Sequence, residues 1–136
     1  MKLTVYLAFT GDANAAIELY QKAFDAKVVS LMHYGDMPVS DNSTPMPDAK
    51  RHYIMHALLD LGESQLRLSD SVLHDVVKGN NVSIAVSLDS PQKVKDAFML
   101  LNQDATVVMD LQETFFSPLF GELIDKFGVN WKLISD

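Results

Sequence analysis

Hydrophobic and polar residues alternate over several short segments of the chain, and each alternation predicts a strand with one buried face. In the first segment Leu3, Val5, Leu7 and Phe9 lie on one face, and more polar residues lie on the other. The same pattern recurs along the sequence. The predicted strands are Lys2–Phe9, Lys27–Tyr34, His52–Leu61, Ser64–Asp70, Asn81–Leu88, Thr106–Glu113, Leu119–Asp125 and Val129–Ser135.

Apolar residues at helical spacing predict two helices, one after Asp12 and one after Ser90. Asp12 is expected to cap the first helix, and Ser90 the second, with Pro91 at the first helical position. The predicted buried stripes are Ala16, Ile17, Tyr20, Ala23 and Phe24 in the first helix and Val94, Ala97, Phe98 and Leu101 in the second. A strand, a helix and three further strands therefore occur twice.

The two halves are related by an internal repeat. At an offset of 77 residues, Ala8, Asp12, Ile17 and Phe24 match Ala85, Asp89, Val94 and Leu101. Near the end of each half the offset is 65, where Arg67-Leu68 matches Lys132-Leu133. About twelve extra residues must therefore lie in the first half. Gly35–Lys50 contains three of the five prolines and lacks apolar periodicity, so we expect it to form a mobile surface flap.

These elements predict an α+β fold of two βαβββ modules, with cupped mixed sheets and the helices on the outer face. We expect one domain over 1–136, with module one at 1–71, a linker at 72–79 and module two at 80–136. Strand parity predicts which residues face the cup, a mixed surface typical of small-molecule sites. They are Thr4, Tyr6, Ala8, His52, Ile54, His56, Leu58, Gln65, Arg67, Ser69, Asn81, Ser83, Ala85, Asn130, Lys132 and Ile134.

Composition narrows the function classes. The 136 residues are 48% apolar and 21% charged, which is ordinary for one soluble domain. The net charge of -7, without a basic stripe, disfavours nucleic acid binding. The absence of cysteine excludes disulfides and thiolate chemistry. We find no signal peptide and no run long enough to cross a bilayer, so we expect a cytoplasmic protein without a membrane partner.

Four phrases resemble the PhnB-like branch of the vicinal oxygen chelate superfamily, which covers glyoxalase I, bleomycin-resistance proteins and extradiol dioxygenases. They are YLAFTGDANAAIELYQKAFDA, HALLDLGESQLRLSD, NVSIAV and LQETFFSPLFGELIDKFGVNWKLI. The most specific part is the Asp-x-Phe-Gly-x-x-Trp that closes the final hairpin. The resemblance implies paired βαβββ modules. Many relatives carry a demethylubiquinone methyltransferase label, but this chain lacks a glycine-rich strand-to-helix turn that seats a nucleotide-type methyl donor.

In metal-dependent members of the superfamily, four cup-facing positions carry the ligands, usually His on the first strand and Glu on the last strand of each module. The resemblance places these positions at Thr4, Arg67, Asn81 and Lys132. Two cations would repel a divalent ion, so we expect no metal and no cofactor. Arg and Lys instead favour an anionic or carbonyl-bearing ligand. The alternative is that both reach the rim and pair with acids such as Asp70, Asp136 or Glu113.

Further candidates are histidines, carboxylates and aromatic residues. His52 and His56 share a strand face about 13 Å apart, so each must act alone. For these two strand histidines, a hydrogen-bonded structural role is the more common one. His33 and His74 lie near loops and are expected to be solvated. Glu113 and Glu122 are expected either as bases or relocated ligands, or as plain edge carboxylates. Trp131 is expected in the core, and Phe115-Phe116 is expected to place one ring on each face of a strand.

The sequence favours a metal-free small-molecule binding protein that forms a homodimer and holds a small anionic or aromatic ligand. The predicted ligand-binding residues are Thr4, Tyr6, His56, Arg67, Asn81, Ser83, Phe116 and Lys132. The alternative is an enzyme of the same superfamily, of the lyase, isomerase or dioxygenase type, that uses relocated metal ligands or a metal-free histidine base. Its candidate catalytic residues are His56, Glu113 and Glu122. A third possibility is a cup filled by the protein's own side chains.

Overall fold

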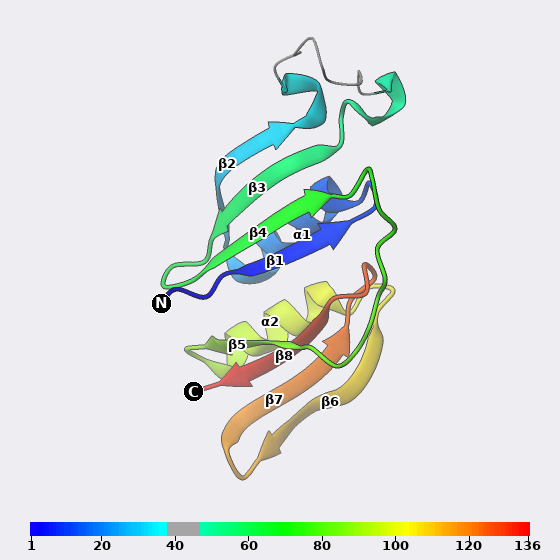
Figure 1. Cartoon of the computed structure of the whole chain (residues 1–136). Helices are drawn as coiled ribbons and strands as arrows, with labels where there is room; N and C mark the ends of the chain where they lie inside the picture. Colours follow the sequence, from blue (N-terminus) through cyan, green and yellow to red (C-terminus); the bar gives the residue numbers. More distant parts are fainter. Residues whose placement is uncertain (38–46) are drawn as a thin grey trace. The chain divides into compact units, whose positions relative to one another are not determined.

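The computed structural model describes residues 1–37 and 47–136. The chain divides into two compact units, Met1–Val76 (unit 1) and Val77–Asp136 (unit 2). Each unit contains one four-stranded mixed sheet and one α-helix, in the order strand, helix and three strands (Figure 1). The predicted α+β fold of two βαβββ modules is therefore confirmed. The assignment of both modules to one domain, and the cup between them, stay predictions. Neither α-helix of the described residues has the length and apolarity needed to cross a bilayer.

In unit 1 the strand order is β1-β4-β3-β2. The central strand β4 is parallel to β1 and antiparallel to β3, and β3 is antiparallel to the edge strand β2. The elements are β1 (Val5–Phe9), α1 (Ala13–Phe24), β2 (Lys27–His33), the 3-10 turns η1 (Tyr34–Asp36) and η2 (Asp48–Lys50), β3 (Ile54–Asp60) and β4 (Gln65–Asp70).

Unit 2 repeats this arrangement with the order β5-β8-β7-β6. Here β8 is parallel to β5 and antiparallel to β7, which is antiparallel to the edge strand β6. The elements are β5 (Ile84–Leu88), α2 (Pro91–Leu101), β6 (Thr106–Thr114), β7 (Ser117–Ile124) and β8 (Asn130–Ser135).

In each unit the helix packs on one face of the sheet, and that face forms the core. The other face, which we call the open face, carries the alternate residues of each strand and is only partly buried. Trp131 is 1% exposed, which confirms its predicted place in the core. The largest buried side chains are Tyr20, Ile54, Leu59 and Leu68 in unit 1 and Val94, Leu101, Leu123, Trp131 and Leu133 in unit 2.

The N-terminus of α1 is capped by a residue far away in the sequence. Asp12 occupies the N-cap position but makes no side-chain cap hydrogen bond, so its predicted capping role is wrong. Asp70, the last residue of β4, is 1% exposed, and its Oδ1 accepts from the amides of Gly11 (2.7 Å) and Ala13 (3.0 Å). Its Oδ2 accepts from the amide of Ile54 (2.9 Å). One carboxylate therefore joins the turn after β1, the start of β3 and the end of β4.

In unit 2 a second buried carboxylate organises the β7–β8 hairpin. Asp125 Oδ1 accepts from the amides of Phe127 (2.9 Å) and Val129 (3.0 Å), and its Oδ2 accepts from the indole Nε1 of Trp131 (2.9 Å). Gly128 adopts a φ of +88° in this turn, a conformation that favours glycine. The Asp-x-Phe-Gly-x-x-Trp phrase is thus a local hydrogen-bonded turn that also fixes the core tryptophan.

The register of the sheets corrects the predicted repeat. Arg67 pairs with Tyr6, and Lys132 pairs with Ala85, so Tyr6 rather than Ala8 corresponds to Ala85. The helices differ similarly, because the buried set of α1 (Ala13, Ala16, Ile17, Tyr20) recurs as Val94, Ala97, Phe98 and Leu101. The offset of 77 is two residues too short in the strands and four too short in the helices. A shift of two residues is one period of a strand, and a shift of four residues is about one turn of a helix. The predicted buried and exposed faces are therefore unchanged.

Local irregularities overturn two further expectations. The β2–β3 register shifts between Met32 and His33, and Ile54 is fully buried rather than on the open face. Phe115 and Phe116 form the β6–β7 turn instead of facing opposite sides of a strand.

The predicted flap Gly35–Lys50 falls largely on residues 38–46, outside the described residues. Its described ends are tied together. The amide of Gly35 donates to the carbonyl of Arg51 (2.8 Å), and Arg51 Nη2 donates to the carbonyl of Gly35 (3.1 Å).

Replacing Asp70 tests its structural role. We expect Asp70→Asn to lower the free energy of unfolding by about 3 kcal/mol, because an amide nitrogen would face backbone donors that then lack an acceptor. Asp12→Asn removes the same charge at the same helix and should cost less than about 1 kcal/mol. Urea denaturation of both variants measures the difference. Equal losses in the two variants would contradict the assignment of Asp70 as the cap.

Candidate functional site

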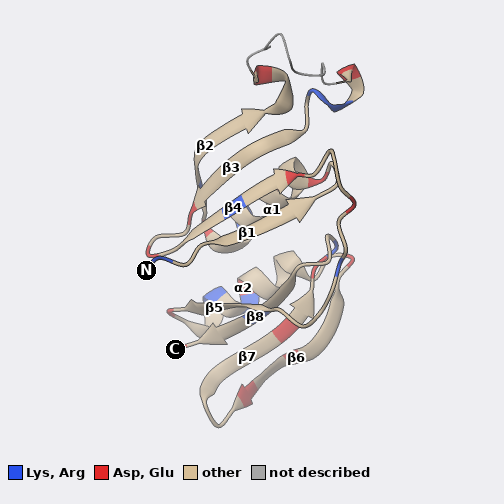
Figure 2. Ribbon diagram, in the orientation of Figure 1, with Lys and Arg blue, Asp and Glu red and all other residues tan. Residues whose placement is uncertain are grey.

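Arg67 lies at the centre of the open face of unit 1. It pairs in register with Tyr6 on β1 and Leu58 on β3, so these three side chains point to the same side of the sheet. Arg67 is half-buried, whereas its strand neighbours Leu66 and Leu68 are buried under α1. Figure 2 shows the basic position inside β4, while the acidic residues of β3 and β4 lie at the strand ends.

His56 on β3 is hydrogen-bonded to Arg67 across the open face. The distance between Arg67 Nη1 and His56 Nε2 is 2.8 Å. A guanidinium can only donate, so Nε2 must be the acceptor and the ring proton must be on Nδ1. His56 is therefore a neutral ring in this pair, and its remaining polar atom is a donor. The predicted ligand-binding residues His56 and Arg67 are brought together by the fold.

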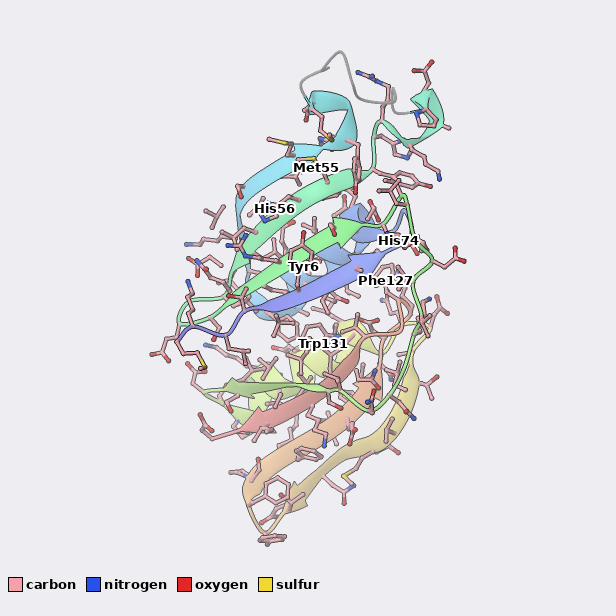
Figure 3. All side chains as sticks on the ribbon, in the orientation of Figure 1. Tyr6, Met55, His56, His74, Phe127 and Trp131 are labelled. Atoms are coloured by element: carbon pink, nitrogen blue, oxygen red, sulfur yellow. The ribbon has the colours of Figure 1, made fainter. Side chains whose placement is uncertain are left out.

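Tyr6 on β1 completes the cluster, with β4 lying between β1 and β3 (Figure 3). Its ring makes an edge contact with His56, with centroids 6.4 Å apart, and Tyr6 is 53% exposed. We call Tyr6, His56 and Arg67 the open-face cluster. Tyr34 is a neighbour of Tyr6 in this cluster. Burial raises the pKa of Tyr34, and the neighbouring Tyr6 and Asp70 raise it further. Tyr34 thus keeps the proton that its hydroxyl donates to the carbonyl oxygen of Asp70 (2.8 Å).

The guanidinium of Arg67 has no carboxylate partner among the described residues. Their ion pairs are His33 with Asp36 and Lys93 with Asp89. Asp70 lies on the same strand but on the opposite face, where backbone amides occupy both of its oxygens. The alternative that Arg67 pairs with Asp70 is therefore wrong. A half-buried cation without a counter-ion is a place where an anionic ligand gains a favourable interaction.

Unit 2 differs at the matching position. Lys132 pairs in register with Glu122 on β7, so a carboxylate lies beside the lysine on the same open face. The open face of unit 2 therefore carries a carboxylate as well as a cation. Glu122 also pairs with Met109, whereas Glu113 is an exposed residue of the edge strand β6. Sequence parity alone places Glu122 on this face, but which residue it opposes depends on register.

The other predicted ligand-binding residues lie outside the open-face cluster. Thr4 and Asn81 precede β1 and β5, and Ser83 is half-buried just before β5. Phe116 packs on Phe120 with ring centroids 5.3 Å apart at the β6–β7 turn. His52 is exposed before β3 and contacts the ring of Tyr53. The ligand-binding roles of Thr4, Asn81, Ser83, Phe116 and Lys132 stay predictions.

The residues at the superfamily's ligand positions do not fit a divalent metal. Arg67 and Lys132 are cations, and the Nε2 lone pair of His56 already accepts from Arg67. Among the residues that the structure describes, no group of three or more His, Asp or Glu side chains is arranged to hold a metal ion. Relocated ligation by His56, Glu113 and Glu122 therefore finds no support in the described residues.

Comparison with known proteins assigns the chain to a family. The model of the 3-demethylubiquinone-9 3-methyltransferase family matches residues 1–134, so the chain belongs to this family. Protein YjdN of Escherichia coli is 28% identical over 98% of this chain and 94% of its own length. The crystal structure of PA1353 from Pseudomonas aeruginosa is 28% identical, with a TM-score of 0.87 over 100% of this chain and 98% of that one.

The PhnB protein from Bacillus cereus is 30% identical, with a TM-score of 0.81 over 100% of both chains. The predicted membership of the PhnB-like branch is therefore confirmed. FosX from Listeria monocytogenes, a fosfomycin resistance protein, is 9% identical with a TM-score of 0.66 over 100% of this chain and 93% of that one. At this identity the likeness concerns the fold alone, and the fold is that of the vicinal oxygen chelate superfamily.

The tautomer of His56 is directly measurable. In ¹⁵N-detected spectra of the imidazole rings at alkaline pH, we expect His56 to carry its proton on Nδ1. Arg67→Ala removes the donor to Nε2, so the ring should shift towards the Nε2–H form that free histidine prefers. The exposed His52 is the internal control and should not respond. An unchanged His56 tautomer in Arg67→Ala would show that the hydrogen bond does not set it.

Proposed function

We propose that this protein binds a small carboxylate without using a metal, with the open-face cluster of unit 1 as the recognition site. The observation that carries the proposal is the Arg67 guanidinium, which is half-buried, donates to His56, and lacks a carboxylate partner among the described residues. Arginine presents several N–H groups in a planar fork. One N–H of Arg67 donates to His56, and the remaining N–H groups can donate to a ligand.

The chemistry of the cluster favours a planar anion with an apolar or aromatic body. Arg67 and the Nδ1–H of His56 are donors, which suits a carboxylate. The exposed ring of Tyr6 and the half-buried Leu58 offer apolar surface on the same face. An aromatic carboxylate can use both kinds of contact, so benzoate is a suitable probe.

The family name points to methyl transfer, but the architecture favours binding. A methyl donor of the nucleotide type needs free amides at a strand-to-helix turn. In unit 1 the amides of Gly11 and Ala13 at this turn already donate to Asp70. The competing enzyme with His56 as a base is also disfavoured, because Nε2 would have to lose its bond to Arg67 before accepting a proton.

The two cations can be tested separately. Benzoate should raise the Tm of the wild-type protein relative to an equal concentration of chloride. Arg67→Ala should weaken benzoate binding by roughly 10- to 100-fold, the loss expected for a charge-assisted hydrogen bond. Lys132→Ala is the matched control, and it should change benzoate binding less than about threefold, because Lys132 lies in unit 2, outside the open-face cluster. Thermal shift titrations measure all three proteins.

A chelator should leave the Tm unchanged in the same assay. One tightly bound metal per chain, together with a lower Tm in chelator, would refute the metal-free proposal and favour the enzyme class. Equal effects of the two substitutions would contradict the assignment of the site to unit 1.

We also propose a homodimer, because two edge strands expose apolar residues. Six of the seven residues of β2 are exposed, including Val29 at 58%, and β6 exposes Val108 at 55%. An apolar edge strand left open is a template for pairing with another chain, so proteins usually cover it. A second copy of this chain would bury such edges by symmetry.

Sedimentation at micromolar concentration should therefore give twice the 15.1 kDa mass of the chain. Val29→Lys or Val108→Lys should shift the equilibrium towards monomer, because a charge would be buried at the contact. Val77→Lys introduces the same charge at an exposed position outside the strands and should leave the mass unchanged. If the wild-type protein sediments only as a 15.1 kDa species, the dimer proposal is wrong.

A further inference from the structure

Unit 1 contains a polar pocket at the carboxyl ends of its two parallel strands, and none of its lining residues belongs to the open-face cluster. The pocket has a volume of about 210 Å³ and is lined by Thr10, Lys50, Tyr53, Ser71, His74 and Asp75, among others. We call it the strand-end pocket. Thr10 directly follows β1 and Ser71 directly follows β4, and these strands are parallel neighbours. In sheets with parallel strands, ligands commonly bind where such strands end.

The walls of the strand-end pocket are fixed by hydrogen bonds. The amide of Ser71 donates to the carbonyl of Phe9 (2.7 Å), and the hydroxyl of Ser71 donates to the carbonyl of His74 (2.6 Å). The second bond closes the segment after β4 into a turn, where Figure 3 shows His74. The amide of Tyr53 donates to the carbonyl of Lys50 (3.1 Å). Both polypeptide segments that carry the pocket's charged groups are therefore held in place.

Two residues of opposite charge, Lys50 and Asp75, line this pocket without forming an ion pair with each other. Lys50 is half-buried, and Asp75 is exposed. The ion pairs among the described residues, His33–Asp36 and Lys93–Asp89, include neither of them. The hydroxyl of Tyr53 lies against the backbone of Gly11, where a Cβ atom would be 2.9 Å from it, and it makes no hydrogen bond to another described residue. An ammonium, a carboxylate and a phenol hydroxyl are thus available to a ligand.

We propose that the strand-end pocket binds a small zwitterion of the α-amino acid type. Its carboxylate would pair with Lys50 and its ammonium with Asp75, so that both charges of the pocket are compensated by one molecule. The volume of about 210 Å³ is below the usual range for drug-sized ligands, but it accommodates a molecule of this size. The charges of Lys50 and Asp75 cancel. A ligand with a single charge would pair with one of these side chains and leave the other without a partner.

NMR titration of the full chain with L-serine tests the proposal, with acetate and ethylammonium as probes that carry one charge each. We expect serine to shift the amide resonances of Thr10 and Ser71–Asp75 saturably, with a Kd on the order of millimolar. Acetate and ethylammonium should shift them at least about tenfold more weakly. Absence of saturable serine shifts at these residues would overturn the proposal, and so would equal binding of acetate or ethylammonium.

Matched variants separate the pocket from general charge effects. Lys50→Gln and Asp75→Asn should each weaken serine binding about tenfold. Lys22→Gln and Glu18→Gln remove the same charges at exposed positions of α1 and should have no effect. A serine affinity that is unchanged in both pocket variants would also overturn the proposal. The test does not depend on the open-face cluster, because Arg67→Ala should leave serine binding intact.

Discussion

The carboxylate of Asp70 holds together the part of unit 1 on which both proposed sites depend. It joins the turn after β1, the start of β3 and the end of β4 through three backbone amides in a site that is 1% exposed. A buried carboxylate is tolerated only when donors replace its water, and these amides do so. Three residues earlier on β4, Arg67 points to the opposite face. The alternation of one strand thus separates a structural charge from a charge available to a ligand.

The two units reach the same architecture with different polar residues. Asp70 corresponds in register to Ser135, and α2 is capped locally by the hydroxyl of Ser90, which accepts from the amide of Lys93. The open faces differ as well, because Glu122 lies beside Lys132, whereas the register partners of Arg67 are Tyr6 and Leu58. The two units therefore share an apolar pattern but differ in their charged residues. This is expected if the core sets the fold and the open face sets the ligand.

Features with a local period were predictable from the sequence, and features that depend on register or on distant contacts were not. The strands, the helices and the burial of Trp131 follow from periods of 2 and 3.6 residues. The face of Arg67 was predictable for the same reason. Its bond to His56, the Glu122–Lys132 pairing and the capping by Asp70 were not, because each joins separate strands. The predicted face of Ile54 was wrong because the alternation of polar and apolar residues does not reveal an irregular strand register.

The wide sequence separation of the Asp70 contacts has a consequence for how this fold tolerates insertions. Gly11 and Asp70 are 59 residues apart, and the segment between them includes the Gly35–Lys50 insertion. The entropy of closing a flexible loop grows only with the logarithm of its length. Extending this loop from about 47 to about 59 residues therefore costs only about 0.2 kcal/mol. The three Asp125 hydrogen bonds described above, by contrast, span two to six residues, and an insertion there would break the turn itself. An insertion in this chain should thus cost little stability in the first unit and much more at the final hairpin.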